Sequence, residues 1–119
     1  MTVPFRRGEI RLANLSPRFG TEPGKTRPVL IIQNQALLDA GHPSTIVIPL
    51  TTNVIESAEP LRLRVEAMGK LRQDSDLLID QGRAIDNRRL GGHPLATLDG
   101  TMMAKVDRAM NEVMGVEQE

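Results

Sequence analysis

Two polar residues occupy the ends of apolar runs, where a side chain can leave a buried strand and reach solvent. Arg27 stands directly before the run 28–32, and Thr51 stands directly after the run 45–50. The planar guanidinium of an arginine can donate two charge-assisted hydrogen bonds to a phosphate, and a threonine hydroxyl can donate another. A guanidinium with a pKa above about 12 is a poor base. These residue types therefore suit the stabilisation of negative charge on phosphorus.

Neither residue is distinctive by itself. Arg27 could pair with Glu9 or Glu22 and merely join two strands, and Thr51 could bond the backbone at the end of a strand. Only a wider pattern that includes both residues gives them a functional meaning.

Other kinds of site find little support in the sequence. Residues 20–26 contain two glycines and a Lys-Thr pair, but they are one residue short of a phosphate-binding loop and lead into a strand pattern rather than a helix. His42 and His93 lie far apart, and neither has a carboxylate at a ligand spacing, so we expect no metal and no cofactor. A Ser-His-Asp hydrolase would need a Gly-x-Ser-x-Gly turn, which the sequence lacks.

Composition predicts a single domain over residues 1–119. Hydrophobic residues make up 39% of the chain, which allows a core, and the absence of cysteine excludes disulfides. Fifteen basic residues balance fifteen acidic ones, and Phe5 and Phe19 are the only aromatics, so any nucleic acid must be held by a local basic patch without a stacking platform. Because we find no signal peptide and no run long enough to cross a bilayer, we expect a cytoplasmic protein without a membrane partner.

The pattern of apolar residues predicts strands early in the chain and a long helix at its end. The expected strands are 8–15, 28–32, 45–50, 61–65 and 77–79, with a helical turn over 34–40 and a turn from Asp86 to Leu90. Strand 61–65 alternates, which places Arg62 and Arg64 in water. A helix should begin after Asp99 and end at Gly115. This order favours an antiparallel sheet or small barrel covered by a C-terminal helix, a fold that is mainly β with α additions.

Five segments follow one another along the chain: from Gly8-Glu9-Ile10 to the Gly20-Thr21-Glu22 loop, then 27–34, 47–51, 80–90 and 103–109. Taken together, they resemble the MazF/PemK family of toxin endoribonucleases of type II toxin–antitoxin systems. The resemblance implies a small SH3-like antiparallel β-barrel with a C-terminal helix, acting as a homodimer. It also implies metal-independent, sequence-specific cleavage of single-stranded RNA by attack of the ribose 2′-OH, and inhibition by a MazE-like antitoxin.

The family's functional residues match particular positions of this chain. Its catalytic arginine matches Arg27 and its catalytic threonine matches Thr51. Its RNA-contacting residues match the loop between the first two strands and a segment near position 82, namely Phe19, Gly20, Thr21, Glu22, Lys25, Gln81 and Arg83. Gly82 departs from the family, which usually has an apolar residue there. Glu22, bound water and substrate-assisted proton transfer stay open as the general base.

Two alternative functions remain at this point. The same fold is used by CcdB-type toxins, which are not enzymes and act by binding DNA gyrase. A degenerate member of the family could instead retain only RNA or antitoxin binding. Arg27 and Thr51 favour the ribonuclease, because a gyrase binder has no need of a group that holds phosphate.

Overall fold

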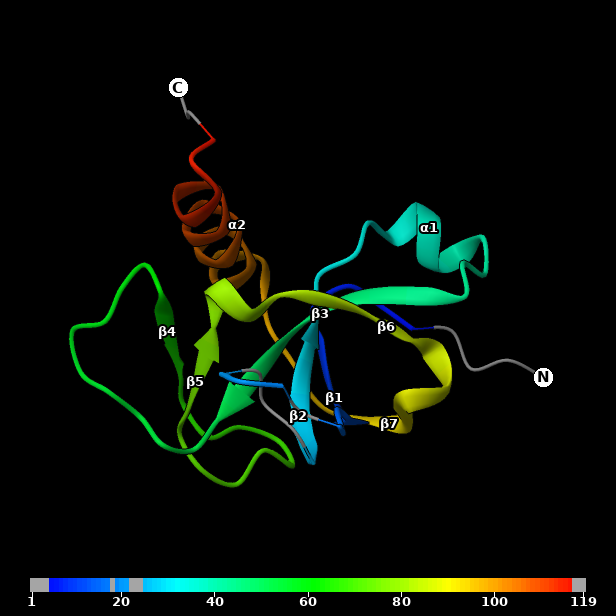
Figure 1. Cartoon of the computed structure of the whole chain (residues 1–119), viewed down its shortest axis with the longest axis horizontal. Coiled ribbons are helices and arrows are strands. Elements are labelled where there is room, and N and C mark those ends of the chain that lie inside the picture. Colours follow the sequence, from blue (N-terminus) through cyan, green and yellow to red (C-terminus); the bar gives the residue numbers. More distant parts are fainter. Residues whose placement is uncertain (1–4, 18, 22–24, 117–119) are drawn as a thin grey trace.

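The computed structural model describes residues 5–17, 19–21 and 25–116. Within these residues, seven strands form an antiparallel sheet in the order β4-β5-β3-β2-β1-β7, and β6 pairs with β3 outside this order. Figure 1 shows the strands curling around one another, with α2 standing at one side. The strands are β1 Glu9–Asn14, β2 Thr26–Ile31, β3 Ser44–Thr51, β4 Arg62–Val65, β5 Ser75–Leu78, β6 Arg83–Asp86 and β7 Leu90–Thr97. The helices are α1 Gln35–Asp39 and α2 Gly100–Met114, and two short 3-10 turns are η1 Ile79–Gln81 and η2 Asn87–Arg89.

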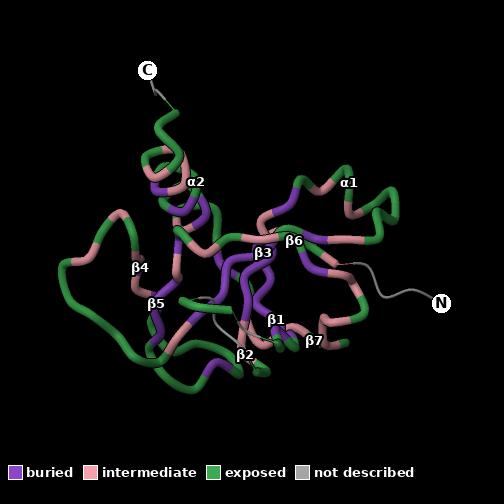
Figure 2. Tube along the Cα trace, in the orientation of Figure 1, coloured by how far each residue is buried: buried purple, intermediate pink, exposed green. Residues whose placement is uncertain are grey.

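The central strands β1, β2 and β3 are covered on both faces. Figure 2 shows the buried residues concentrated there. Because side chains alternate along a strand, each central strand contributes to two clusters, one on each face of the sheet. The cluster on the α2 side includes Ile10, Leu30, Ile48, Leu50, Met103 and Val106. The cluster on the α1 side consists of Ala13, Leu15, Val29, Ile31, Val47 and Ile85, and Leu38 of α1 packs against it.

Helix α2 begins and ends as its sequence predicts. The Asp99 side chain accepts a hydrogen bond from the Met102 amide at 2.8 Å, and Gly115 ends the helix at φ 75°, a left-handed conformation that favours glycine. Met103, Val106 and Ala109 are its buried residues. Among the described residues, no helix is long and apolar enough to cross a membrane.

The first three residues of β1 are buried on both faces, and one of these faces carries a charged pair. Glu9 and Arg11 point to the face opposite Ile10 and form an ion pair at 2.9 Å, with the Arg11 side chain 1% exposed. Arg11 also donates to the Gly91 carbonyl at 3.0 Å and stacks over the Phe5 ring. Glu9 therefore has Arg11 as its partner, at the opposite end of β1 from the residue that faces Arg27.

The fold-class prediction is confirmed, since the protein is mainly β and carries a C-terminal helix. The predicted elements 8–15, 28–32, 34–40, 45–50, 61–65 and 77–79 all exist, with ends shifted by a few residues. Strands β6 and β7 were not predicted. β7 contains Gly91, Gly92 and Pro94, which disfavour strands, and its pairing with β1 shifts register on either side of Arg11.

Candidate active site

Arg27 and Thr51 lie at the end of the pairing between β2 and β3. β2 pairs with β3 through Val29 opposite Pro49 and Ile31 opposite Val47. Val29 and Pro49 are the last pair, and Arg27 and Thr51 each lie two residues beyond it, on the α1-side face by the alternation of side chains along a strand. Each side chain is half-buried. The two residues that the sequence singled out thus lie at the same end of the sheet and on the same face.

Thr51 has a defined local environment at the end of β3. Its hydroxyl oxygen accepts a hydrogen bond from the Asn53 amide at 3.1 Å, which fixes the hydroxyl in the turn that follows the strand. Because a hydroxyl can donate and accept at the same time, its proton is still available to an oxygen of a ligand. On the other edge of β3, Thr51 is the strand partner of Asp76.

Asp76 holds two arginines beside Thr51. Its side chain is 2% exposed and receives Arg64 Nε at 2.7 Å, Arg62 Nη1 at 3.4 Å and the Ile55 amide at 2.8 Å. Burial raises the pKa of this carboxyl, but the hydrogen bonds from Arg64, Ile55 and Arg62 outweigh burial and hold the pKa of Asp76 below its usual range. The expectation that Arg62 and Arg64 lie in water is therefore wrong: a buried carboxylate on the next strand draws both back against the sheet.

The loop between β1 and β2 is closed at its base. The Leu15 amide donates to the Lys25 carbonyl at 2.8 Å, and the Lys25 amide donates to Ser16 Oγ at 2.9 Å. Arg89 Nη1 donates to the carbonyls of Asn14 at 3.0 Å and of Ser16 at 2.7 Å. These hydrogen bonds fix the base of the loop at Lys25, two residues before Arg27.

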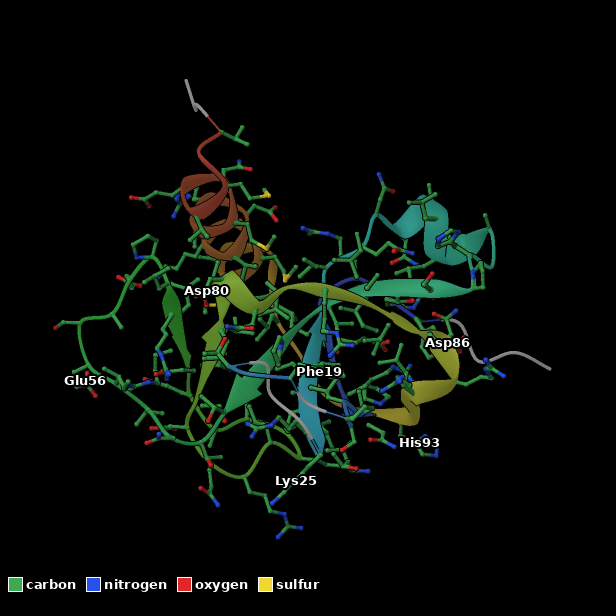
Figure 3. The ribbon with its side chains drawn as sticks, viewed as in Figure 1. Phe19, Lys25, Glu56, Asp80, Asp86 and His93 are labelled. Carbon is green, nitrogen blue, oxygen red and sulfur yellow. The ribbon has the colours of Figure 1, made fainter. Side chains whose placement is uncertain are left out.

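The tip of the same loop is exposed. Phe19 is 72% exposed and is labelled with Lys25 in Figure 3. Gly20, Thr21 and Lys25 are also exposed. Glu22, the acidic candidate in this loop, lies outside the described residues.

Arg83 shares the face of the sheet that carries Arg27. It opens β6 opposite Val47, which is also the partner of Ile31. Gly82 is in extended backbone at φ −60°, so the departure from the family at this position does not prevent the strand. The Nη1 atom of Arg83 is buried and has no hydrogen-bond partner among the described residues. Such an atom is uncommon and has capacity for a ligand oxygen. Gln81, half-buried, ends η1 just before it.

The side chains that could bind a metal ion are scattered over the described residues. In the described part of the chain, no three residues among His, Cys, Asp and Glu are grouped so that they could hold a metal ion. His42 and His93 are both exposed. Arg27 continues directly into β2, so residues 20–26 do not lead into a helix as a phosphate-binding loop would.

Comparison with known proteins shows the family of the chain. The family model of the PemK-like, MazF-like toxins of type II toxin–antitoxin systems matches residues 6–114. The chain belongs to this PemK/MazF-like family. It is 37% identical to "Endoribonuclease MazF" of Staphylococcus epidermidis over 116 residues, which cover 94% of this chain and 92% of that protein.

Two further PemK/MazF-like proteins are similar over most of their length. "Endoribonuclease EndoA" of Bacillus subtilis (strain 168) is 38% identical over 109 residues, covering 88% of this chain and 90% of the relative. The crystal structure of MazF (Form-I) from Deinococcus radiodurans superimposes with a TM-score of 0.79 at 21% identity, covering 96% of this chain and 99% of that one. The structural likeness supports the fold, and the sequence likeness supports the family.

Sequence reasoning missed the side chains that hold the site in place. Asp76 was not singled out, although Arg62 and Arg64 alternate on the neighbouring strand and a carboxylate two strand positions into β5 could have been paired with them. Arg89 was noted only as part of the family pattern. Its hydrogen bonds to the base of the β1–β2 loop join residues that are 73 or more positions apart in the sequence. A local sequence pattern cannot predict such a contact.

Proposed function

We propose that this protein is the toxin of a toxin–antitoxin module, a metal-independent endoribonuclease that cuts single-stranded RNA at specific sequences and so inhibits translation. The observation that supports this proposal is that Arg27 and Thr51 lie on one face of the sheet, each two residues beyond the last pair of β2 and β3, within a family match over nearly the whole chain. A phosphate placed between these two side chains could receive hydrogen bonds from both.

The reaction uses the substrate's own nucleophile. The ribose 2′ oxygen attacks the adjacent phosphorus, forming the O2′–P bond and breaking the P–O5′ bond. The products are a 2′,3′-cyclic phosphate and a 5′-hydroxyl. In its simplest balanced form, the 2′-OH proton leaves to water and the departing 5′ oxygen takes one proton. The enzyme's task is therefore to position the strand and to stabilise the additional negative charge on phosphorus.

Arg27 and Thr51 perform this stabilisation. The guanidinium of Arg27 holds two non-bridging oxygens, and Thr51 donates its hydroxyl proton to the same phosphate. A preorganised donor of this kind contributes about 3–4 kcal/mol to lowering the barrier. Arg83 is a third donor on the same face, because its buried Nη1 has no hydrogen-bond partner in the described part of the chain and can take an oxygen of the RNA strand. Phe19, Gly20, Thr21, Glu22, Lys25 and Gln81 border the bound RNA.

The protein acts as a homodimer of single-domain subunits, each spanning residues 1–119, in the cytoplasm, where messenger RNA is translated. Exposed apolar side chains at the end of α2, Met114 at 61% and Val116 at 50%, offer surface for a second copy. A MazE-like antitoxin keeps the toxin inactive, as the description of the family as one half of a toxin–antitoxin system suggests.

One assay tests the proposal. Purified protein is incubated with a long single-stranded RNA in EDTA, and the cuts are mapped by primer extension. We expect discrete cuts that disappear in Arg27→Ala and Thr51→Ala, while Arg88→Ala, which alters an arginine with 90% of its side chain exposed, cuts like the wild type. Circular dichroism confirms that each variant is folded.

Two results would overturn the proposal. If folded Arg27→Ala cuts at the wild-type rate, the site is assigned wrongly. If the wild type leaves every RNA intact and inhibits DNA supercoiling by gyrase, the protein is a binding toxin of the CcdB type.

A further inference from the structure

Thr51 belongs to a row of three side chains on one face of the sheet. It pairs with Asp76 of β5, and Asp76 pairs on its other side with Arg64 of β4. Directly paired residues of antiparallel strands point to the same face, so these three side chains lie side by side. The row therefore places a buried carboxylate next to a residue of the proposed active site.

The segment that follows Thr51 has no buried residue to anchor it. Residues 52–57 are all exposed, including the apolar Val54 and Ile55. Figure 1 shows this segment leaving the end of β3 and passing outside β4. Since burial of apolar side chains does not hold the segment against the sheet, its position depends on polar contacts.

One oxygen of Asp76 supplies such contacts. Its Oδ2 accepts a hydrogen bond from the Ile55 amide at 2.8 Å and lies 3.4 Å from Arg62 Nη1. The same Nη1 atom donates to the Asn53 carbonyl at 3.0 Å. The Asn53 amide in turn donates to Thr51 Oγ1 at 3.1 Å. A continuous chain of contacts thus leads from the buried carboxylate through the turn to the hydroxyl of Thr51.

The other oxygen of Asp76 leads away from Thr51. Its Oδ1 accepts a hydrogen bond from Arg64 Nε at 2.7 Å, and Arg64 Nη2 donates to Glu56 at 3.1 Å. The Glu56 side chain is 83% exposed, and Figure 3 shows it at the outer edge of the molecule. This branch therefore ends in an ion pair at the surface, whereas the first branch ends at the turn of residues 51–53.

We propose that Asp76 is a positioning residue of the ribonuclease, which holds the turn after β3 so that the Thr51 hydroxyl stays oriented toward the phosphate. The inference rests on the proposed function and adds a residue to it. A hydroxyl that accepts from the Asn53 amide directs its own proton away from that amide, so this contact decides where the proton can be donated. Asp76 itself is a poor base, because three donors already occupy its two oxygens. Its part in the reaction is to orient Thr51.

The first test compares two arginine variants that each remove one branch. Arg62→Met removes the link to Asn53 and only the longer ion pair, whereas Arg64→Met removes the shorter ion pair and leaves the contacts of the turn in place. Cleavage of a single-stranded RNA in EDTA should show a kcat about 10-fold lower for Arg62→Met, within the roughly 100-fold that loss of a donor causes, and a KM within about twofold of the wild type. Asp76→Asn should lower kcat at least as much, and Arg64→Met should keep the wild-type kcat.

Urea unfolding of the same variants separates positioning from stability. Arg64→Met should lose more of the free energy of unfolding than Arg62→Met, because it loses the 2.7 Å contact to a buried carboxylate. Activity and stability should therefore rank the two arginine variants in opposite order. If kcat instead falls in parallel with the free energy of unfolding, or if folded Arg62→Met has the wild-type kcat, Asp76 serves stability alone and the inference fails.

The second test observes Thr51 in the protein without RNA. Three-bond couplings to its methyl carbon, measured by NMR, report the χ1 angle, and a side chain held in one orientation gives the values of a single rotamer. We expect a single rotamer in the wild type and in Arg64→Met, and averaged values in Arg62→Met and Asp76→Asn. Couplings that stay unchanged in all three variants would overturn the inference.

These results distinguish the positioning role from the ribonuclease itself. If the wild type cuts RNA while Arg62→Met and Asp76→Asn retain its kcat and its Thr51 couplings, the positioning role fails and the ribonuclease stands. If the wild type cuts no RNA while the couplings become averaged in Asp76→Asn, the ribonuclease fails and the control of Thr51 by Asp76 stands.

Discussion

The buried carboxylate of Asp76 should contribute more to stability than any exposed ion pair of this protein. Asp76→Asn keeps an oxygen for the Ile55 amide but removes the charge that Arg64 and Arg62 approach at 2.7 and 3.4 Å. Hydrogen bonds to charged groups are worth about 1.5–3 kcal/mol, and the longer Arg62 contact adds little. The arginines are 30% and 23% exposed and can recover some hydration. We therefore expect a loss of about 2–3 kcal/mol in the free energy of unfolding.

The control is a second Asp-Arg pair in the same chain. Asp86 is bonded by Arg88 Nε at 2.9 Å, and Arg88 lowers the pKa of Asp86 to about 2, yet the two side chains are 44% and 90% exposed. Solvent screens such a pair, and asparagine can still accept from the Arg88 amide as Asp86 does. Asp86→Asn should therefore cost less than about 1 kcal/mol.

Urea unfolding followed by far-ultraviolet circular dichroism at fixed protein concentration measures both changes, since the chain has no tryptophan or tyrosine to report by fluorescence. Because the pKa of Asp76 is lower when folded, its contribution is present above pH 4, near the unfolded pKa, and is lost as pH falls through the folded pKa. The difference between wild type and Asp76→Asn should thus shrink below about pH 4. Equal costs for Asp76→Asn and Asp86→Asn at pH 7 would refute the reasoning.

Three further predictions concern the active site, the β1–β2 loop and helix α2. Arg27→Lys keeps the charge but loses the two-pronged donor, so RNA cleavage in EDTA should fall about 100-fold or more while the unfolding curve is unchanged. Arg89→Ala removes two hydrogen bonds from the base of the β1–β2 loop, so amide exchange at Leu15 and Lys25, measured by NMR, should become faster than in Arg88→Ala. Gly115→Ala forces a side chain into left-handed backbone and should cost about 1 kcal/mol, whereas Gly100→Ala in the first turn of the same helix should be neutral or stabilising in thermal unfolding.

The sequence predicts those elements whose signals are local. β2 and β3 contain continuous runs of apolar and β-branched residues, and α2 has a capping aspartate at one end and a glycine at the other. β7 is not predicted because two glycines and Pro94 disfavour a strand. These residues adopt strand geometry because they pair with β1. That pairing is a tertiary contact, which no window of sequence contains.

The residues of the candidate site can be proposed from the sequence, but their arrangement cannot. Arg27 and Thr51 are proposed from their positions at the ends of apolar runs together with the family pattern. That they lie at the same end of the sheet depends on the register between β2 and β3, and that Arg83 shares their face depends on the register between β3 and β6.

The irregular pairing of β7 also bears on how the sheet ends. β7 is the last strand in the order, and such a strand offers unpaired amides and carbonyls that can recruit a strand from another molecule. Its register shifts twist it away from a flat ladder, and Pro94 removes one amide donor from its backbone. The Lys70 amide already occupies the Leu95 carbonyl of this strand at 2.7 Å. The features that make β7 hard to recognise in the sequence thus also make this end of the sheet a poor template for a strand of another molecule.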